Sequence, residues 1–149
     1  MKATLSALPA QRITGGINAD EPYWEHLAKG EFRLSRCAEC KSWIWPAHYR
    51  CGECGSWEIE WVELPPKGVV YSWTRTWYPF DRTAERAEDI PYVTVLAEVA
   101  GAGGARVLGV LDGDESGLAI GAPVHGVIKP PSPKSKGYPS ICWVLGEQP

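Results

Sequence analysis

Two closely spaced pairs of cysteines constrain this chain more than any other feature. Cys37 pairs with Cys40 and Cys51 with Cys54, each with two residues between the cysteines, and ten residues separate the pairs. This spacing lets both sulfur atoms of a pair face one ion, so two such turns supply four tetrahedral thiolate ligands. The pattern predicts a closed structural zinc site with a short hairpin between the two turns.

The spacing alone does not exclude other uses of the four cysteines. Two disulfides would suit a secreted framework or a redox enzyme, but the N-terminal residues lack the apolar stretch of a signal peptide. Rubredoxin-like iron uses the same ligands and would make the chain an electron carrier. A catalytic zinc ion is disfavoured because four cysteines leave no coordination position open for water or substrate. The fifth cysteine, Cys142, lies in an apolar strand pattern, where an inert thiol is favoured over a nucleophile.

The composition favours short strands and turns. The 149 residues include 16 glycines and 13 prolines, and 8 tryptophans, which disfavours an all-helical bundle. No apolar run approaches the length of a membrane-spanning helix. We therefore expect a cytoplasmic protein that does not bind a membrane.

The pattern along the chain predicts one short helix, a cysteine-rich segment and five strands. Asp20 is a candidate N-cap and Gly30 a candidate stop for a helix with one apolar face. Alternating β-branched and aromatic residues predict strands, which together suit a small closed or partly closed barrel. The expected strands are residues 69–78, 91–99, 105–111, 122–129 and 140–146. The expected divisions are 1–30 (an N-terminal arm, residues 1–17, and the helix), 31–62 (the ribbon) and 63–149 (the barrel).

Aromatic residues alternate in two places. Trp43 and Trp45 are expected on one side of a strand between the cysteine pairs. Such residues could fill the barrel or pack it against the ribbon, or they could form an exposed patch for a partner protein or a flat ligand. A second alternating set, expected on one strand face, is Tyr71, Trp73, Arg75 and Trp77.

The charged residues and histidines give weaker signals. The net charge is −3, whereas proteins that hold nucleic acid through phosphate contacts usually carry a basic surplus. Three lysines in one loop region suit either a solvated loop or contact with a phosphorylated cofactor. No spacing indicates a nucleophile with its base, so we expect no catalytic residue. The lysines are Lys129, Lys134 and Lys136, and the scattered histidines are His26, His48 and His125.

Four segments in order resemble one known family. They are PYWEHLAKGEFRLSRCAEC, CGECGSWEIEWVELPPKGVVYSWT, PYVTVLAEV and IGAPV, spread over roughly residues 20–130. They resemble the zinc-ribbon plus OB-fold family once catalogued as domain of unknown function thirty-five. The resemblance implies a mainly β fold: a short N-terminal helix, a rubredoxin-like zinc ribbon with the four cysteines as ligands, and a five-stranded OB-fold barrel.

The resemblance also implies a function. Members of the family look like accessory subunits of acyl-CoA enzymes, in complex with thiolases, with lipid-transfer-protein-like aldolases of steroid side-chain breakdown, or with acyltransferases. Some accompany enoyl-CoA hydratase-like proteins. It implies that the thiolase-like partner supplies the chemistry on acyl-CoA. If the chain binds a dimeric partner of this kind, symmetry makes a heterotetramer the expected assembly. The alternative class is a single-stranded nucleic-acid binder, because OB folds and zinc ribbons both serve that purpose.

Two sets of residues are expected to serve such a complex. Apolar side chains on the short helix and the ribbon would anchor the partner, because aromatic residues are favoured at interfaces. The three lysines would contact the phosphates of CoA. The expected anchors are Tyr23, Trp24, Leu27, Trp43 and Trp45.

Overall fold

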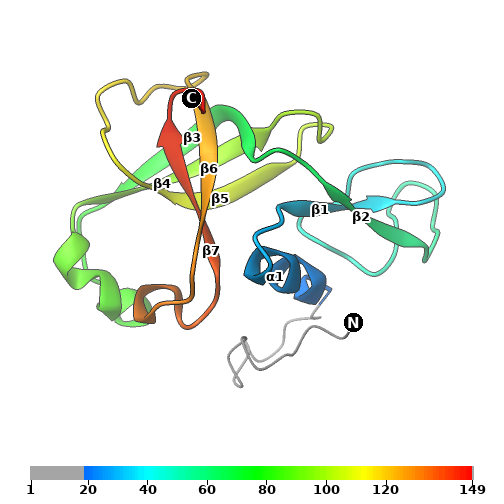
Figure 1. Ribbon diagram of the computed structural model, residues 1–149, viewed down its shortest axis with the longest axis horizontal. Helices are drawn as coiled ribbons and strands as arrows, with labels where there is room; N and C mark the ends of the chain where they lie inside the picture. Colours follow the sequence, from blue (N-terminus) through cyan, green and yellow to red (C-terminus); the bar gives the residue numbers. More distant parts are fainter. Residues whose placement is uncertain (1–18, 149) are drawn as a thin grey trace.

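The computed structural model describes residues 19–148, so the arm expected at residues 1–17 lies outside the described range. No helix within that range is long and apolar enough to cross a bilayer. The elements are α1 (Glu21–Ala28), β1 (Arg33–Cys37), β2 (Ile59–Glu63), β3 (Lys67–Thr76), the 3-10 helix η2 (Asp81–Asp89), β4 (Tyr92–Val99), β5 (Arg106–Leu111), β6 (Pro123–Lys129), the 3-10 helix η3 (Pro133–Ser135) and β7 (Ser140–Leu145) (Figure 1).

The last five strands close into a barrel in the order β3-β4-β5-β7-β6. All neighbours are antiparallel except β5 and β7, which run parallel. Every second residue of β4, from Val93 to Val99, is buried, as expected for a strand with one face toward a core. Trp143 of β7 is fully buried, and its indole N–H donates to the carbonyl of Val107 over 3.2 Å. The predicted mainly β fold with a five-stranded barrel is confirmed.

The ribbon is a much smaller unit. β1 and β2 form a two-stranded antiparallel sheet with Arg33 opposite Glu63 and Cys37 opposite Ile59. Its own buried cluster holds only Cys37, Ile44 and Cys51, with Ile59 packed partly against them. A two-stranded sheet with so small a core is marginal by itself, so the ribbon needs support from a metal ion and from the barrel.

A chain of aromatic rings connects the ribbon to the barrel. Trp45 lies 4.7 Å from Tyr23 of α1, measured between ring centroids, and Tyr23 lies 6.5 Å from Phe32. Phe32 in turn lies 6.4 Å from Trp143 inside the barrel. In Figure 1, α1 lies beneath β1, beside the lower part of the barrel. The helix therefore joins the ribbon and the barrel into one core.

This packing corrects part of the predicted partner surface. Tyr23 and Leu27 are 3% and 1% exposed and belong to the chain's own core, so they have no surface to offer a partner. Trp24 is half-buried, donates a hydrogen bond to Asp20 over 2.9 Å, and lies against Tyr138. The helix has the predicted apolar face, but the barrel and the ribbon bury it.

Trp43 fastens the ribbon to the barrel by a different contact. The predicted strand through Trp43 and Trp45 is wrong, because the structure has only an isolated bridge between Arg36 and Trp43. The Arg36 guanidinium lies over the Trp43 indole, with 5.2 Å between the guanidinium carbon and the ring centroid. On the barrel side it contacts Gly103, where an added Cβ would lie 2.6 Å from the ring. The small turn between β4 and β5 thus makes room for Trp43.

The aromatic face of β3 differs from the predicted one. Val70 and Ser72 lie opposite two consecutive residues of β4, so Tyr71, which lies between them, is the extra residue of a β-bulge. Tyr71 stacks under Arg106 instead, with 3.6 Å from the guanidinium carbon to the ring centroid. Trp73 and Arg75 keep the expected alternation, whereas Trp77 lies just beyond the end of β3. Both tryptophan rings lie 5.9 Å from the Arg75 guanidinium. Tyr71, Trp73 and Trp77 are exposed, which favours the patch interpretation over internal packing.

We predict that Gly103→Ala destabilises the protein more than Gly104→Ala. Both glycines have positive φ, at 59° and 87°, so both substitutions carry the same type of backbone strain. Only at Gly103 would the new methyl group collide with Trp43, which adds about 1–3 kcal/mol of overpacking. Urea unfolding followed by tryptophan fluorescence measures the difference. Equal losses for the two variants would show that the contact with Trp43 does not fasten the ribbon.

Candidate metal centre

The four ribbon cysteines converge on one point. Their sulfur atoms all lie within 4.8 Å of one another, and Cys37 lies 3.6 Å from Cys54, as does Cys40 from Cys51. A tetrahedral zinc site with Zn–S bonds of about 2.3 Å holds its sulfur atoms about 3.8 Å apart. The arrangement therefore fits a closed four-thiolate metal site. Each turn contributes one buried and one exposed cysteine.

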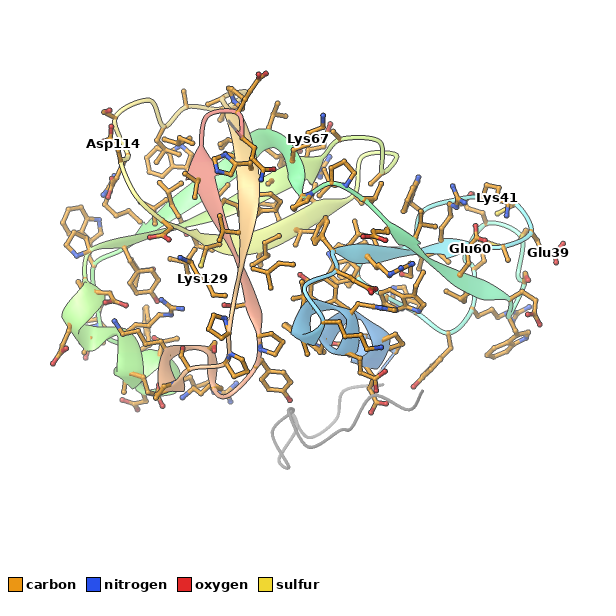
Figure 2. The ribbon with its side chains drawn as sticks, in the orientation of Figure 1. Glu39, Lys41, Glu60, Lys67, Asp114 and Lys129 are labelled. Carbon is orange, nitrogen blue, oxygen red and sulfur yellow. The ribbon has the colours of Figure 1, made fainter. Side chains whose placement is uncertain are left out.

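The two turns that carry the cysteines have the same backbone structure. In each, the amide of the first cysteine donates to the carbonyl five residues later, and the amide four residues later donates back to that cysteine's carbonyl. The residue after the second cysteine adopts positive φ in both, 63° at Lys41 and 78° at Gly55. Glycine suits that conformation and lysine does not. Lys41 is held there while its ammonium group pairs with Glu60 at 3.2 Å (Figure 2).

The electrostatics of the cluster call for a cation. Hydrogen bonds with the hydroxyl and backbone of Ser42 lower the pKa of Cys40 to about 6. At Cys54 the backbone bond with Ser56 lowers the pKa, but the three neighbouring sulfur atoms outweigh it and raise the pKa to about 11. Four thiols this close do not all ionise alone, because each negative charge disfavours the next. A divalent metal ion removes that obstacle.

The three candidate lysines are all paired within the chain. The β6–β7 connection places two of them against acidic residues of η2. The third, Lys129, lies at the end of β6 (Figure 2). The structure therefore does not gather them into one free cationic site, and phosphate contact stays a prediction. The ion pairs are Lys134 with Asp89 at 2.5 Å, Lys136 with Glu85 at 2.6 Å and Lys129 with Asp112 at 2.8 Å.

The remaining candidates for chemistry stay separate. Burial raises the pKa of Cys142, whose strand neighbours are Val110 and Val127, as expected for an inert thiol. His26 lies 3.1 Å from Glu31, and His125 bonds the carbonyl of Gly146. Within residues 19–148, only the four ribbon cysteines form a group of three or more His, Cys, Asp or Glu side chains able to hold a metal ion.

Sequence reasoning missed Trp57, whose ring is among the most exposed of the aromatic side chains. Trp57 follows the second cysteine turn, is 67% exposed, and lies 5.5 Å from the Arg50 guanidinium, measured to the ring centroid. Its flanking serine and glutamate residues were the available signal of exposure. Other exposed aromatic side chains are Tyr49 on the ribbon and Trp77, Tyr78 and Phe80 between β3 and η2.

A four-cysteine ribbon ahead of a closed five-stranded barrel defines a zinc-ribbon plus OB-fold protein. Two family models match the chain in series: the rubredoxin-like zinc ribbon domain of ChsH2 over residues 24–60 and the C-terminal OB-fold domain of ChsH2 over residues 61–129. The chain belongs to the ChsH2/DUF35 family. The expected family resemblance is confirmed; the predicted domain boundaries at 30 and 62 stay a prediction.

Individual relatives agree with this assignment. A chain of a structure named Ltp2-ChsH2(DUF35) aldolase is 26% identical, with a TM-score of 0.70 over 90% of this chain and 97% of that one. A DUF35-family structure of unknown function from Sulfolobus solfataricus is 18% identical, with a TM-score of 0.58 over 97% of this chain and 93% of that one, and supports the fold alone. A probable enoyl-CoA hydratase alpha subunit of Thermomonospora curvata is 33% identical over 91 residues. The match covers 60% of this chain, which spans 27% of that relative's length.

We predict that Cys51→Ser abolishes metal binding and unfolds the ribbon, whereas Cys142→Ser changes neither. The substitutions are chemically identical, but only Cys51 belongs to the cluster. Metal binding at such sites contributes on the order of 10–16 kcal/mol, far more than the small ribbon core. Elemental analysis and near-ultraviolet circular dichroism check the prediction. Metal bound equally by both variants would place it elsewhere, and iron in the purified protein would restore the electron-carrier interpretation.

Proposed function

We propose that this chain is a non-catalytic accessory subunit that binds a thiolase-superfamily partner and supports its reaction on acyl-CoA thioesters. The observation that carries the proposal is the similarity, along nearly the whole chain, to the chain from the Ltp2-ChsH2(DUF35) aldolase. A steroid or lipid side-chain aldolase is the first candidate for the reaction, and a thiolase or acyltransferase the second.

The described residues suit an accessory role. Many of the charged side chains of residues 19–148 form surface ion pairs, such as Arg36 with Glu60 and Arg75 with Glu115, and the four ribbon thiols lie in one cluster. A subunit without its own nucleophile can still order a lid or close a channel of its partner. We further propose a cytoplasmic heterotetramer with the partner, in which closed symmetry pairs two copies of each chain. The hydratase-named relative supports a hydratase-like protein as an additional neighbour.

The ribbon is the proposed partner surface. Its exposed aromatic side chains are Tyr49 and Trp57, and the half-buried Trp24, Trp43 and Trp45 extend that surface toward α1. Aromatic residues that combine apolar area with few rotatable bonds dominate binding energy at interfaces. Because Trp57 is 67% exposed and does not belong to the buried cluster of the ribbon, its removal should leave the ribbon core intact.

We predict that Trp57→Ala weakens capture of the partner at least tenfold, whereas Trp77→Ala does not. The two tryptophans are matched controls, at 67% and 70% exposed, on the ribbon and the barrel respectively. The measurement uses the tagged chain to recover proteins from native cell extract at low salt, followed by titration of the co-purified enzyme. A thiolase-like protein in near-equal amount supports the proposal. Recovery without such a protein contradicts it, and a larger effect of Trp77→Ala would move the surface to the barrel.

We predict that Lys134→Ala combined with Lys136→Ala raises the KM of the complex for acyl-CoA. Both ammonium groups are about half exposed and able to exchange their carboxylate partners for a phosphate. Lys29→Ala, which removes an exposed lysine next to α1, serves as the control for lost charge. Steady-state kinetics of the assembled complex measures the KM of each variant for acyl-CoA. An unchanged KM would leave the region as ordinary solvated surface.

A single-stranded nucleic-acid binder is the second candidate. The exposed Trp73 and Trp77 on the barrel favour it, because bases stack on aromatic side chains of OB folds. The net charge of −3 opposes it, because such proteins bind the phosphate backbone through lysine and arginine side chains. A fluorescent oligonucleotide that fails to bind even at low salt would eliminate this candidate.

A further inference from the structure

Three side chains form a row across one face of the ribbon. Arg36 lies opposite Glu60 in the pairing of β1 with β2, and on its other side it bridges to Trp43. Residues that lie opposite each other on neighbouring strands point to the same face. The Arg36 Nε atom donates to the Glu60 carboxylate over 2.7 Å, and the guanidinium lies over the Trp43 indole. The row therefore runs from β2 across β1 to the side chain that meets the barrel at Gly103.

Glu60 also holds the first cysteine turn, residues 37–41. Its Oε1 atom accepts from the Lys41 ammonium group over 3.2 Å, and the same oxygen accepts from Arg36 (Figure 2). Lys41 directly follows Cys40, and its backbone amide donates to the carbonyl of Cys37 over 3.1 Å. One carboxylate oxygen thus joins the turn that carries two of the four thiols to the row that reaches the barrel.

Lysine is an unexpected residue at position 41. The backbone there has a positive φ of 63°, a conformation that glycine adopts readily and other residues seldom do. The second cysteine turn has Gly55 at the matching position, with a φ of 78°. The first turn therefore needs an interaction that offsets its backbone strain, and the ion pair between Lys41 and Glu60 supplies one.

The surroundings of Glu60 favour a lasting interaction. An isolated ion pair on a protein surface contributes little, and networks of several charges are the exception. The Glu60 side chain is 34% exposed and meets two cations. Hydrogen bonds from Arg36 and Lys41 lower the pKa of Glu60, so this carboxyl group is ionised at neutral pH. Glu63, at the other end of β2, is 60% exposed and pairs with Arg33, so it offers a comparison on the same strand.

We propose that Glu60 is a positioning residue of the metal centre, which couples the conformation of the first cysteine turn to the contact of Trp43 with the barrel. Glu60 is not itself a candidate ligand, because four thiols complete a tetrahedral site. It acts through two cations: Lys41 connects it to the turn, and Arg36 connects it to Trp43. Coupling of this kind is reciprocal. A change at the ribbon–barrel junction therefore alters how firmly the turn retains its metal ion.

The first test measures the rate at which zinc leaves the full zinc-loaded chain in an excess of a chromophoric chelator. Glu60→Gln should release zinc about threefold faster than the wild type, in the range expected for the loss of surface ion pairs. Glu63→Gln is the matched control, because it removes the same charge from the same strand, and it should leave the rate unchanged. A wild-type rate in Glu60→Gln, or equal acceleration by both variants, would overturn the proposal.

A second background separates positioning from a general loss of stability. Lys41→Gly gives the first turn the residue type of the second, and glycine adopts the positive φ without an ion pair. In that background, Glu60→Gln should accelerate zinc release by no more than about 1.5-fold, because residues that act through one contact are not additive. A variant that merely unfolded the ribbon would release zinc equally fast in both backgrounds, and that result would overturn the positioning role.

The link to the barrel is tested in the same assay. Gly103→Ala pushes a methyl group into the Trp43 ring, so it should speed zinc release although it lies in a barrel turn. Gly104→Ala, where an added Cβ meets nothing within 4 Å, should not. The acceleration by Gly103→Ala should disappear when Glu60→Gln is already present. Unchanged release from Gly103→Ala, or full additivity of the two substitutions, would show that Glu60 does not couple the metal centre to the barrel.

Discussion

The mutual repulsion of four thiolates is the constraint on which the ribbon depends. The ribbon's buried cluster contains three residues, and two of them are cysteines of the metal site. Apolar burial therefore supplies little stability unless a cation neutralises the cluster. Two turns with the same hydrogen bonds place the sulfur atoms, and the strain at Lys41 shows that this backbone geometry is kept even where the residue opposes it. The fold of the first half of the molecule follows from coordination chemistry.

The barrel is stabilised by burial of apolar side chains, and contacts between aromatic rings attach the ribbon to it. Trp143 is buried inside the barrel and packs against Phe32. Phe32 packs against Tyr23, and Tyr23 packs against Trp45 of the ribbon. The rings span the gap between two small sheets with few rotatable bonds, which limits the entropy lost on ordering them. A metal-stabilised ribbon therefore stays attached to the barrel in one orientation.

The sequence allowed the metal ligands and the barrel strands to be predicted, because both depend on local spacing. The cysteine turns need only a fixed separation, and the strands need only alternating residues. What could not be predicted depends on contacts between distant segments. Tyr23 and Leu27 form an apolar face whether a partner or the barrel covers it, and only the folded chain shows the barrel there. The bulge at Tyr71 likewise leaves no mark in the alternation, yet it removes that ring from the face of Trp73.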